Sequence, residues 1–196
     1  TIAGAAGSNV QAGYTSGQVG VDQLIAAVPE AQKLGKLRGE QISNIGSQDM
    51  NDEVWLKLGN RINELVAMPD VTGVVITHGT DTMEETAYFL HLVVKSKKPV
   101  VLTAAMRPAT ALSADGPLNF FNAVAVAASK DAVGRGVLVV VNDWIHGAAS
   151  LTKTSTTAVQ TFLSPQSGLI GTVAYGTIEF YRAPIGKHTA DTEFSL

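Results

Sequence analysis

The chain has 196 residues, of which 45% are hydrophobic and 16% charged, and its 14 Lys and Arg against 17 Asp and Glu leave a net charge of −3. This composition can bury a core, which excludes an intrinsically disordered chain, and it lacks the basic excess of a nucleic-acid binder. The absence of cysteine excludes disulfides, thiolate metal sites and cysteine nucleophiles. No apolar run approaches the ~18 residues of a membrane span, so we expect no membrane insertion.

The first twenty residues are rich in Gly, Ala, Ser and Gln. They follow neither helical nor strand periodicity, which predicts a mobile N-terminal loop over residues 4–20. A frayed terminus is the alternative, but Tyr14 is a large aromatic side chain among small ones. Because the sequence starts at Thr1 without an initiator Met or a basic signal region, we expect it to be a piece of a longer protein.

Helical segments alternate with apolar runs along the rest of the chain. We expect a short helix over residues 21–28, a longer one capped by Asn51 with apolar side chains at the helical period, and another over 118–128. A further helix is predicted to open at Thr82, where Glu85 stands three residues on, as in a capping box. The Asp-Gly-Pro sequence before residue 118 indicates a turn.

Continuous apolar runs predict strands buried on both faces at residues 73–77, 99–103 and 136–141. A further strand is expected at 41–45 and a hairpin at 171–181. Buried strands that alternate with amphipathic helices predict an α/β fold, with a three-layer, mostly parallel, doubly wound sheet of the flavodoxin-like type and helices on both faces.

The polar, unpatterned residues 184–196 predict a linker that leads out of a catalytic domain formed by residues 1–183. In an open α/β sheet, ligands bind beyond the carboxyl ends of the strands. Four stretches of small or polar residues directly follow apolar runs and are candidates for such a site: residues 45–49, 77–82, 103–107 and 142–143.

The second of these stretches holds Thr80, Asp81 and Thr82 at the start of a predicted helix. A hydroxyl and a carboxylate there could bind one ligand, since a helix N-terminus favours developing negative charge, but taken alone the pattern fits ordinary helix caps better. Lys153 lies in a hydroxyl-rich segment, and a buried lysine could act as a base toward a threonine, although spacing alone favours a solvated surface lysine. No metal site and no nucleotide-binding loop is predicted, because no glycine pattern fits and ligand spacing is missing from the four histidines, His78, His91, His146 and His188.

Two hypotheses follow from these residues: a hydrolase that uses threonine, lysine and aspartate, or a non-catalytic domain whose loops bind a small polar molecule such as an amino acid. In a third, the amino group of Thr1 would serve as base for its own hydroxyl. Such N-terminal-nucleophile hydrolases are built on antiparallel sheets, so the parallel-sheet pattern counts against that reading.

Three segments resemble bacterial type II L-asparaginases and the related glutaminase-asparaginases: residues 1–4, residues 76–87 (ITHGTDTMEETA), and residues 105–117, which begin AMRP and end SADGP. The similarity runs along essentially the whole chain, and the last segment resembles the secreted type II branch. The resemblance implies hydrolysis of L-asparagine to L-aspartate and ammonia through an acyl-enzyme, without metal or organic cofactor, in the periplasm or outside the cell.

Carried over by position, the resemblance implies that Thr1 is the nucleophile and Tyr14 the tyrosine of a lid formed by the N-terminal loop. Thr80, Asp81 and Lys153 match a second threonine with a carboxylate and a lysine behind it. Which threonine attacks first stays open. The resemblance also implies that Ser47 and Gln48 bind the α-carboxylate and α-amino groups of the substrate and that the backbone of Ala105 contacts the substrate amide. The neighbouring glycines, Gly46 and Gly79, complete the implied substrate-binding residues.

Family members also carry an apolar strand ending in two glycines before the position of Thr1 and a smaller C-terminal α/β domain, and we expect both to be missing from this sequence. In the family, that domain of a neighbouring subunit completes each site within a homotetramer, a dimer of dimers, so the activity belongs to the full-length protein. Gln48 stands where several dual-activity members carry glutamate, which favours asparaginase with secondary L-glutaminase activity over a dual-specificity enzyme.

Overall fold

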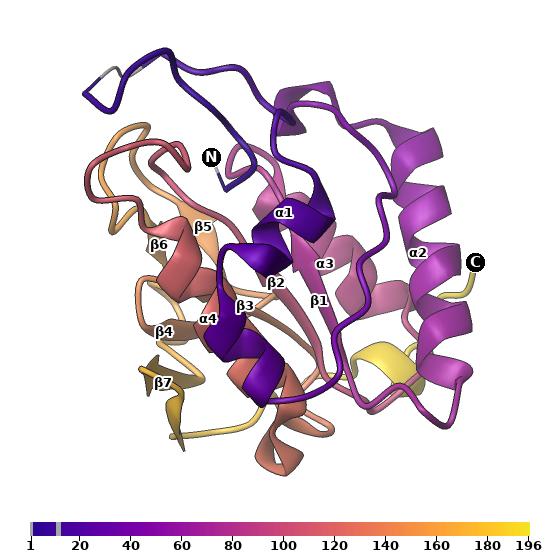
Figure 1. Ribbon diagram of the computed structural model, residues 1–196. Coiled ribbons are helices and arrows are strands. Elements are labelled where there is room, and N and C mark those ends of the chain that lie inside the picture. The colour runs from indigo at the N-terminus through magenta and orange to yellow at the C-terminus, as the bar shows by residue number, and fades with distance from the viewer. Residues whose placement is uncertain (1, 11–12) are drawn as a thin grey trace.

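A six-stranded sheet in the order β1-β2-β3-β4-β7-β8 forms the middle layer of the fold in the computed structural model, which describes residues 2–10 and 13–196 (Figure 1). The first three strands pair in parallel, and the remaining neighbours pair antiparallel. Since β1, β2, β3 and β7 run in one direction, the predicted α/β fold with a mostly parallel sheet is confirmed, as a mixed sheet. The strands of this sheet are β1 (Val74–Thr77), β2 (Val100–Thr103), β3 (Val137–Val141), β4 (Trp144–Gly147), β7 (Gly171–Ala174) and β8 (Thr177–Phe180). A separate two-stranded sheet consists of β5 (Thr152–Lys153) and β6 (Phe162–Leu163).

Helices cover both faces of the sheet because successive side chains of a buried strand point in opposite directions. On one face, α4 (Gly116–Ala128) packs against Val101, Leu138 and Val140. On the other face, α2 (Asp52–Ala67) and α3 (Met83–Val93) cover the core to which Val100 and Val139 belong. Figure 1 shows α4 and α1 (Val21–Ala26) in front of the sheet and α3 behind it. The other helices are four short 3₁₀ helices, Pro29–Lys33, Ser47–Asp49, Lys130–Ala132 and Thr189–Asp191.

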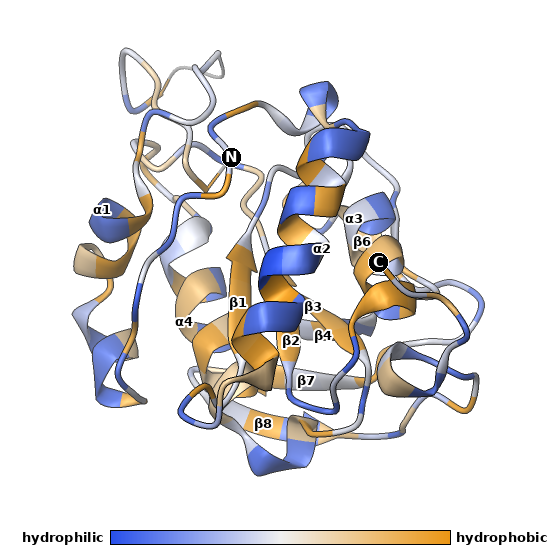
Figure 2. Ribbon diagram, turned by 90° about the vertical axis from the view of Figure 1, so that its right-hand side faces the viewer, coloured by the Kyte–Doolittle hydropathy of each residue, from blue (hydrophilic) through white to orange (hydrophobic). Residues whose placement is uncertain are grey.

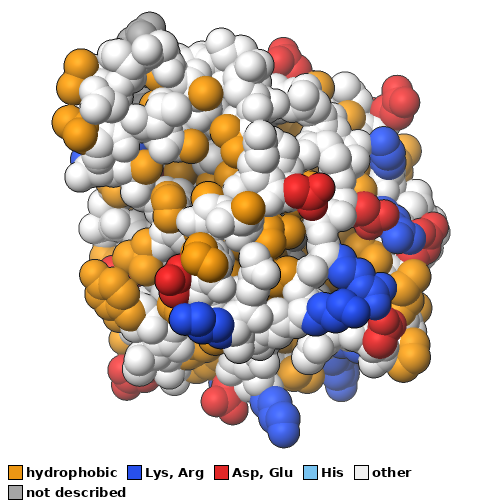
Figure 3. Space-filling view, in the orientation of Figure 1, with side chains coloured by type: hydrophobic (Ala, Val, Ile, Leu, Met, Phe, Trp, Pro, Cys, Tyr) orange, Lys and Arg blue, Asp and Glu red, His pale blue; other side chains and the backbone are white. Residues whose placement is uncertain are grey.

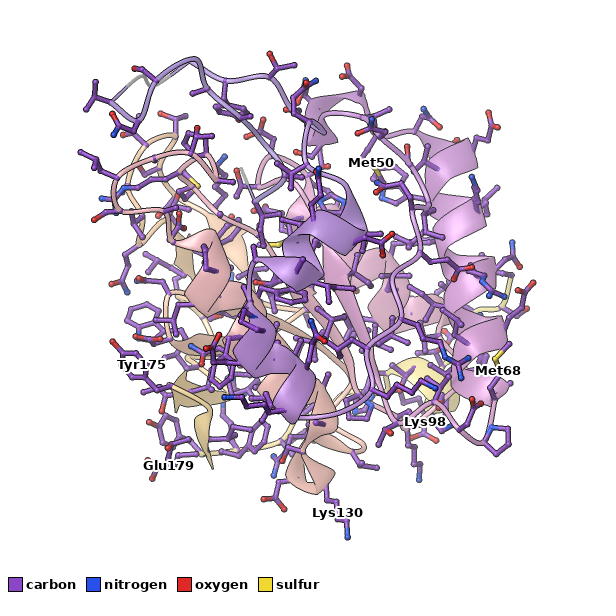
Figure 4. The ribbon with its side chains drawn as sticks, viewed as in Figure 1. Met50, Met68, Lys98, Lys130, Tyr175 and Glu179 are labelled. Atoms are coloured by element: carbon purple, nitrogen blue, oxygen red, sulfur yellow. The ribbon has the colours of Figure 1, made fainter. Side chains whose placement is uncertain are left out.

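The predicted cap of α2 is confirmed, because the Asn51 side chain accepts a hydrogen bond from the backbone N–H of Val54 at 3.1 Å. Figure 2 shows hydrophilic residues alternating with hydrophobic ones along α2, as expected of a helix with one buried side. Met50 and Met68 lie at the two ends of α2 in Figure 4. Lys98 Nζ donates to the Met68 carbonyl at 2.6 Å, which fastens the carboxyl end of the helix to the segment before β2.

The prediction of a strand at residues 41–45 is wrong, because within the described residues this part of the chain is a loop that pairs with no strand. A cavity of about 790 Å³ is lined by residues of this loop and of β1, among others. The loop is fastened to α2 instead, where Lys57 Nζ donates to the Ile42 carbonyl at 2.8 Å.

The predicted capping box is also wrong, because the Thr82 hydroxyl donates to the Ser47 carbonyl at 2.7 Å and makes no cap bond to α3, while Glu85 is exposed. The turn predicted before residue 118 is the first turn of α4, which begins at Gly116 because proline fits the first helical positions. The hairpin at 171–181 is confirmed as β7 and β8. Tyr175 and Gly176 connect them with φ of 49° and 82°, as a type I′ turn requires.

The C-terminal residues pack against α3 at the end of the molecule opposite the N-terminal loop (Figure 1). Lys95 Nζ donates to the Thr192 carbonyl at 3.0 Å and to its hydroxyl at 2.9 Å. The rings of His91 and His188 lie 5.1 Å apart, both buried. This segment is therefore fastened to the domain, and its role as a linker stays a prediction. Within the described residues, the helices are too short or too polar to cross a membrane.

Candidate active site

Lys153, on the short strand β5, is the centre of the candidate site. Its side chain is only 15% exposed, so the interpretation as a solvated surface lysine is wrong. Its Nζ donates to Thr80 Oγ1 at 2.8 Å and to Asp81 Oδ1 at 2.6 Å. Because the side chains of Thr80 and Asp81 bond to lysine rather than to the start of α3, their interpretation as ordinary caps is wrong as well.

Ser47 lies directly against the loop between β1 and α3. Its Oγ accepts a hydrogen bond from the backbone N–H of Asp81 at 3.1 Å, and its carbonyl accepts one from Thr82. A Cβ atom on Gly79 would stand 2.5 Å from Ser47 Oγ, so only glycine permits this approach. The structure therefore brings together two predicted substrate-binding residues, Ser47 and Gly79, with Thr80 and Asp81.

Gln48, by contrast, is exposed and turns toward its neighbour, with Nε2 donating to Asp49 Oδ2 at 3.2 Å. Gly46 leaves room for that side chain, since a Cβ there would stand 2.3 Å from Gln48 Nε2. Both residues belong to the loop that carries Ser47, but in this structure Gln48 makes no hydrogen bond to Thr80, Asp81 or Lys153. Its role as a substrate contact stays a prediction.

Ala105 follows β2 and is buried, with 2% of its surface exposed. It lines the same small cleft as Thr80, so the structure brings this predicted contact to the site. Asp115 fixes the loop after Ala105, because its two carboxylate oxygens accept the backbone N–H groups of Met106 and Arg107, each at 2.9 Å. The sequence pattern indicated only a turn at Asp115, because its contacts to residues eight and nine positions earlier follow neither helical nor strand periodicity.

Two further residues near the site are absent from the predicted set. Asn119 donates to the Ala104 carbonyl and accepts from the N–H of Asn142, both at 2.9 Å, which joins the loops after β2 and β3. Glu84 accepts a hydrogen bond from the backbone N–H of Lys153. An amide or a carboxylate inside a helical pattern looks like an ordinary surface residue, so periodicity offers no means of finding either one.

The N-terminal loop crosses the top of the molecule in Figure 1, above the parallel strands. Its Ala5 and Thr15 form an antiparallel bridge, and it bonds to a neighbouring loop, where the N–H of Ala6 donates to Thr110 Oγ1 at 3.0 Å. Tyr14 is 43% exposed. Partial burial raises the pKa of its phenol, and the negative charge of Asp81 raises it further. The phenol of Tyr14 therefore interacts electrostatically with Asp81 of the candidate site.

Thr1 lies outside the described residues, and its predicted role as nucleophile stays a prediction. Uncharged side chains cover most of the upper left part of the face shown in Figure 3, where the N-terminal loop lies. Burial lowers the pKa of the ring of His78, in the loop with Thr80, and so favours its neutral form.

Known proteins are similar in sequence to this chain along its whole length. A family model described as "Asparaginase, N-terminal" matches residues 1–186. The "Probable L-asparaginase periplasmic" of Haemophilus influenzae is 58% identical over 196 residues, which cover 100% of this chain and 56% of that relative. The "Glutaminase-asparaginase" of Pseudomonas fluorescens is 50% identical over 100% of this chain and 54% of its own length.

A solved structure titled "Crystal Structure of Probable Cytoplasmic L-asparaginase from Campylobacter jejuni" superimposes with a TM-score of 0.97 at 49% identity, over 100% of this chain and 60% of that one. The chain thus spans little more than half the length of the relatives it matches. The match of fold and sequence confirms the resemblance, and the parallel strands β1 to β3 argue against the N-terminal-nucleophile fold. The chain therefore belongs to the asparaginase family, and it matches the N-terminal domain of that family.

Proposed function

We propose that this chain forms the catalytic domain of an amidohydrolase that converts L-asparagine to L-aspartate and ammonia, with secondary activity on L-glutamine. The observation that carries the proposal is the contact of Lys153 Nζ with both Thr80 Oγ1 and Asp81 Oδ1 beyond the carboxyl end of β1. Relatives named L-asparaginase and glutaminase-asparaginase, at 58% and 50% identity, support the substrate class.

A threonine hydroxyl is a weak nucleophile until a neighbouring base takes its proton. Lys153 is suited to that task toward Thr80, because its nitrogen lies 2.8 Å from the hydroxyl oxygen and its side chain is largely shielded from water. In the proposed reaction, the hydroxyl oxygen of Thr1 attacks the side-chain amide carbon while its proton passes through Thr80 to Lys153. The same proton then returns to the amide nitrogen, so that the tetrahedral adduct releases ammonia and an aspartyl ester remains. Water then cleaves the ester to L-aspartate, with Thr80 and Lys153 relaying the protons.

The α-groups of the substrate require partners of their own. The side chain of Asp81 is 53% exposed and uses only Oδ1 toward Lys153, so it can also bind the substrate ammonium. The loop around Ser47 offers a hydroxyl and, at Gln48, an amide for the α-carboxylate, with Gly46 and Gly79 allowing the backbone to approach. The backbone of Ala105, just beyond the end of β2, would contact the substrate amide that is cleaved.

The N-terminal loop with Tyr14 would close over the bound substrate and exclude bulk water, which strengthens the electrostatic contacts inside. We further propose a catalytic domain over residues 1–183 with a linker at 184–196, and a homotetramer, a dimer of dimers, in the whole protein. A periplasmic or secreted location is proposed from the relative named periplasmic, although the solved neighbour is titled cytoplasmic. The proposed chemistry uses no cofactor, metal, nucleic acid or membrane.

Thr80→Val in the complete gene product tests the proposed reaction. The substitution keeps the shape of the side chain and removes the hydroxyl that faces Lys153. We expect ammonia release from L-asparagine to fall below detection while the Kd for L-asparagine, measured by calorimetry, changes by less than about tenfold, or ~1.4 kcal/mol. The matched control is Thr157→Val, an exposed threonine a few residues beyond the Lys153 strand. Normal turnover in Thr80→Val would refute the mechanism, and tight binding without turnover in the unaltered protein would identify a non-catalytic binder.

Selectivity is tested by measuring kcat/KM for both amides with the same preparation. A higher value for L-asparagine is expected, because Gln48 brings no negative charge to the substrate-binding loop. Equal values would instead support a dual-specificity glutaminase-asparaginase, which is the name of a relative at 50% identity.

A further inference from the structure

We propose that Glu84 is a positioning residue that fixes Lys153 against Thr80 and Asp81. Its carboxylate accepts two hydrogen bonds from β5: Oε2 accepts the backbone N–H of Lys153 at 2.5 Å, and Oε1 accepts the hydroxyl of Thr152 at 3.2 Å. Hydrogen bonds to an ionised acceptor are about twice as strong as neutral ones. The proposal rests on the proposed function, since it concerns the geometry of the proposed base.

The strand that carries Lys153 lies outside the main sheet, and its other contacts include the pairing with β6, bonds from Thr154 and Ser155 to Thr161, and the packing of Leu151 and Phe162 in the core. β5 has two residues and pairs with the equally short β6, and neither strand joins the six-stranded sheet. A lysine side chain has four rotatable bonds, so its nitrogen can be placed accurately only if its Cα is fixed as well. Glu84 supplies that second attachment at the backbone of the lysine itself.

The attachment comes from the same segment that carries the partners of the lysine nitrogen. Thr80 and Asp81 precede α3 directly, and Glu84 is the second residue of that helix. The backbone and the side-chain nitrogen of Lys153 are thus bonded to one short stretch of chain, residues 80–84. Any motion of β5 relative to the sheet would have to break contacts at both ends of the lysine, which keeps the distance to Thr80 constant.

A plainer role for Glu84 is an acidic residue in the first turn of a helix, where it would interact with the helix dipole. Glu85 shares that role, because it is in the same turn with the same charge, but it is exposed and forms no side-chain hydrogen bond within the described residues. The two neighbours differ in their contact with β5, so Glu85 is the matched control.

The test compares Glu84→Ala, Glu84→Gln and Glu85→Ala in the complete gene product. Glu84→Ala is expected to lower kcat at least tenfold, with KM for L-asparagine changed by less than threefold, because a misplaced base slows the reaction more than it weakens binding. Glu84→Gln should retain at least a third of the kcat, since its amide oxygen still accepts the N–H of Lys153. Glu85→Ala should keep the kcat of the unaltered protein.

Thr152→Val serves as a milder variant that leaves the fold and the charge in place. It removes only the 3.2 Å bond, and a two- to fivefold loss of kcat is expected. Hydrogen exchange of the Lys153 amide adds a readout without turnover: Glu84→Ala should abolish its protection and Glu85→Ala should not. Unchanged kcat in Glu84→Ala or Thr152→Val, an equal loss in the glutamine and alanine variants, or retained amide protection would overturn the positioning role. Absence of turnover in the unaltered protein would contradict the proposed function instead, and the exchange measurement would still decide whether Glu84 fixes the backbone.

Discussion

Replacing Asn119 by leucine should destabilise the fold where the loops of the candidate site meet. Asn119 lies on α4 with 4% of its surface exposed. Its Nδ2 donates to the Ala104 carbonyl after β2, and its Oδ1 accepts the N–H of Asn142 after β3, both at 2.9 Å. Leucine has nearly the same size but can neither donate nor accept a hydrogen bond, so both backbone groups would lose their partner.

The magnitude follows from those two contacts. A buried backbone group left without a hydrogen bond costs about 1–3 kcal/mol. Because the Ala104 carbonyl is buried and the Asn142 N–H only partly so, the two together cost about 2–4 kcal/mol. Leucine favours a helix over asparagine by about 0.5 kcal/mol, which offsets a small part. We therefore expect Asn119→Leu to lower the free energy of unfolding by about 3 kcal/mol, which is a large share of the 5–15 kcal/mol of a typical domain.

Urea unfolding measures the loss, and hydrogen exchange of the Asn142 amide reports whether it arises at the predicted contact. The control is Asn60→Leu on α2, where the asparagine is exposed and bonds only within its own helix, and where a change below about 0.5 kcal/mol is expected. An Asn119→Leu variant as stable as this control, or one with an unchanged Asn142 exchange rate, would refute the reasoning.

Two further predictions concern packing and pH. Gly79→Ala should raise KM for L-asparagine and destabilise the fold by about 1–3 kcal/mol, because the new Cβ would stand 2.5 Å from Ser47 Oγ, whereas Gly35→Ala meets open space and should change neither quantity. Burial lowers the pKa of His91 and His146 to about 4. Between pH 6.5 and pH 4 the unfolded chain therefore binds more protons than the folded one. As the pH falls through that window, the free energy of unfolding should decrease by up to about 3 kcal/mol per histidine. Denaturation midpoints at a series of pH values check this, and a His146→Leu variant with the same pH dependence as the unaltered chain would contradict it.

Strands β1, β2 and β3 could be predicted from the sequence because each forms an uninterrupted apolar run. The expected burial on both faces holds for β2 and β3, whereas β1 lies at the edge of the described sheet and is only partly buried. The predicted starts of these three strands at Gly73, Pro99 and Gly136 each fall one residue before the observed strand, since these residues contribute poorly to a sheet. The prediction of a strand at 41–45 was wrong, and the reason is not a matter of strand boundaries. A local pattern cannot show whether a partner lies within hydrogen-bonding distance, and among the described residues no strand pairs with this segment.

The residues of the candidate site likewise fall into those that a local sequence pattern can predict and those that it cannot. Thr80 and Ala105 could be grouped because each follows a strand, and the carboxyl ends of parallel strands meet at one edge. Ser47 was grouped with them through the predicted strand at 41–45, which the structure does not contain, although Ser47 does contact Asp81. Lys153 could not be placed in this way, because it is 73 positions from Thr80 and belongs to a two-residue strand outside the main sheet. Its position depends on individual contacts such as the one to Glu84, which have no period in the sequence.

His78 shows how such contacts determine a role that residue spacing leaves open. Indole Nε1–H of Trp55 can only donate, so Thr86 Oγ1 accepts from it at 2.8 Å, and the Gly79 carbonyl can only accept, so His78 Nδ1 donates to it at 2.7 Å. A neutral ring then leaves Nε2 as an acceptor, and the Thr86 hydroxyl donates to it at 3.0 Å. The low pKa that burial gives the ring agrees with this neutral tautomer. Both nitrogens are thus engaged in fixing the backbone before Thr80, which makes His78 part of the support of the site and leaves neither nitrogen for a metal ion or for proton transfer to a substrate.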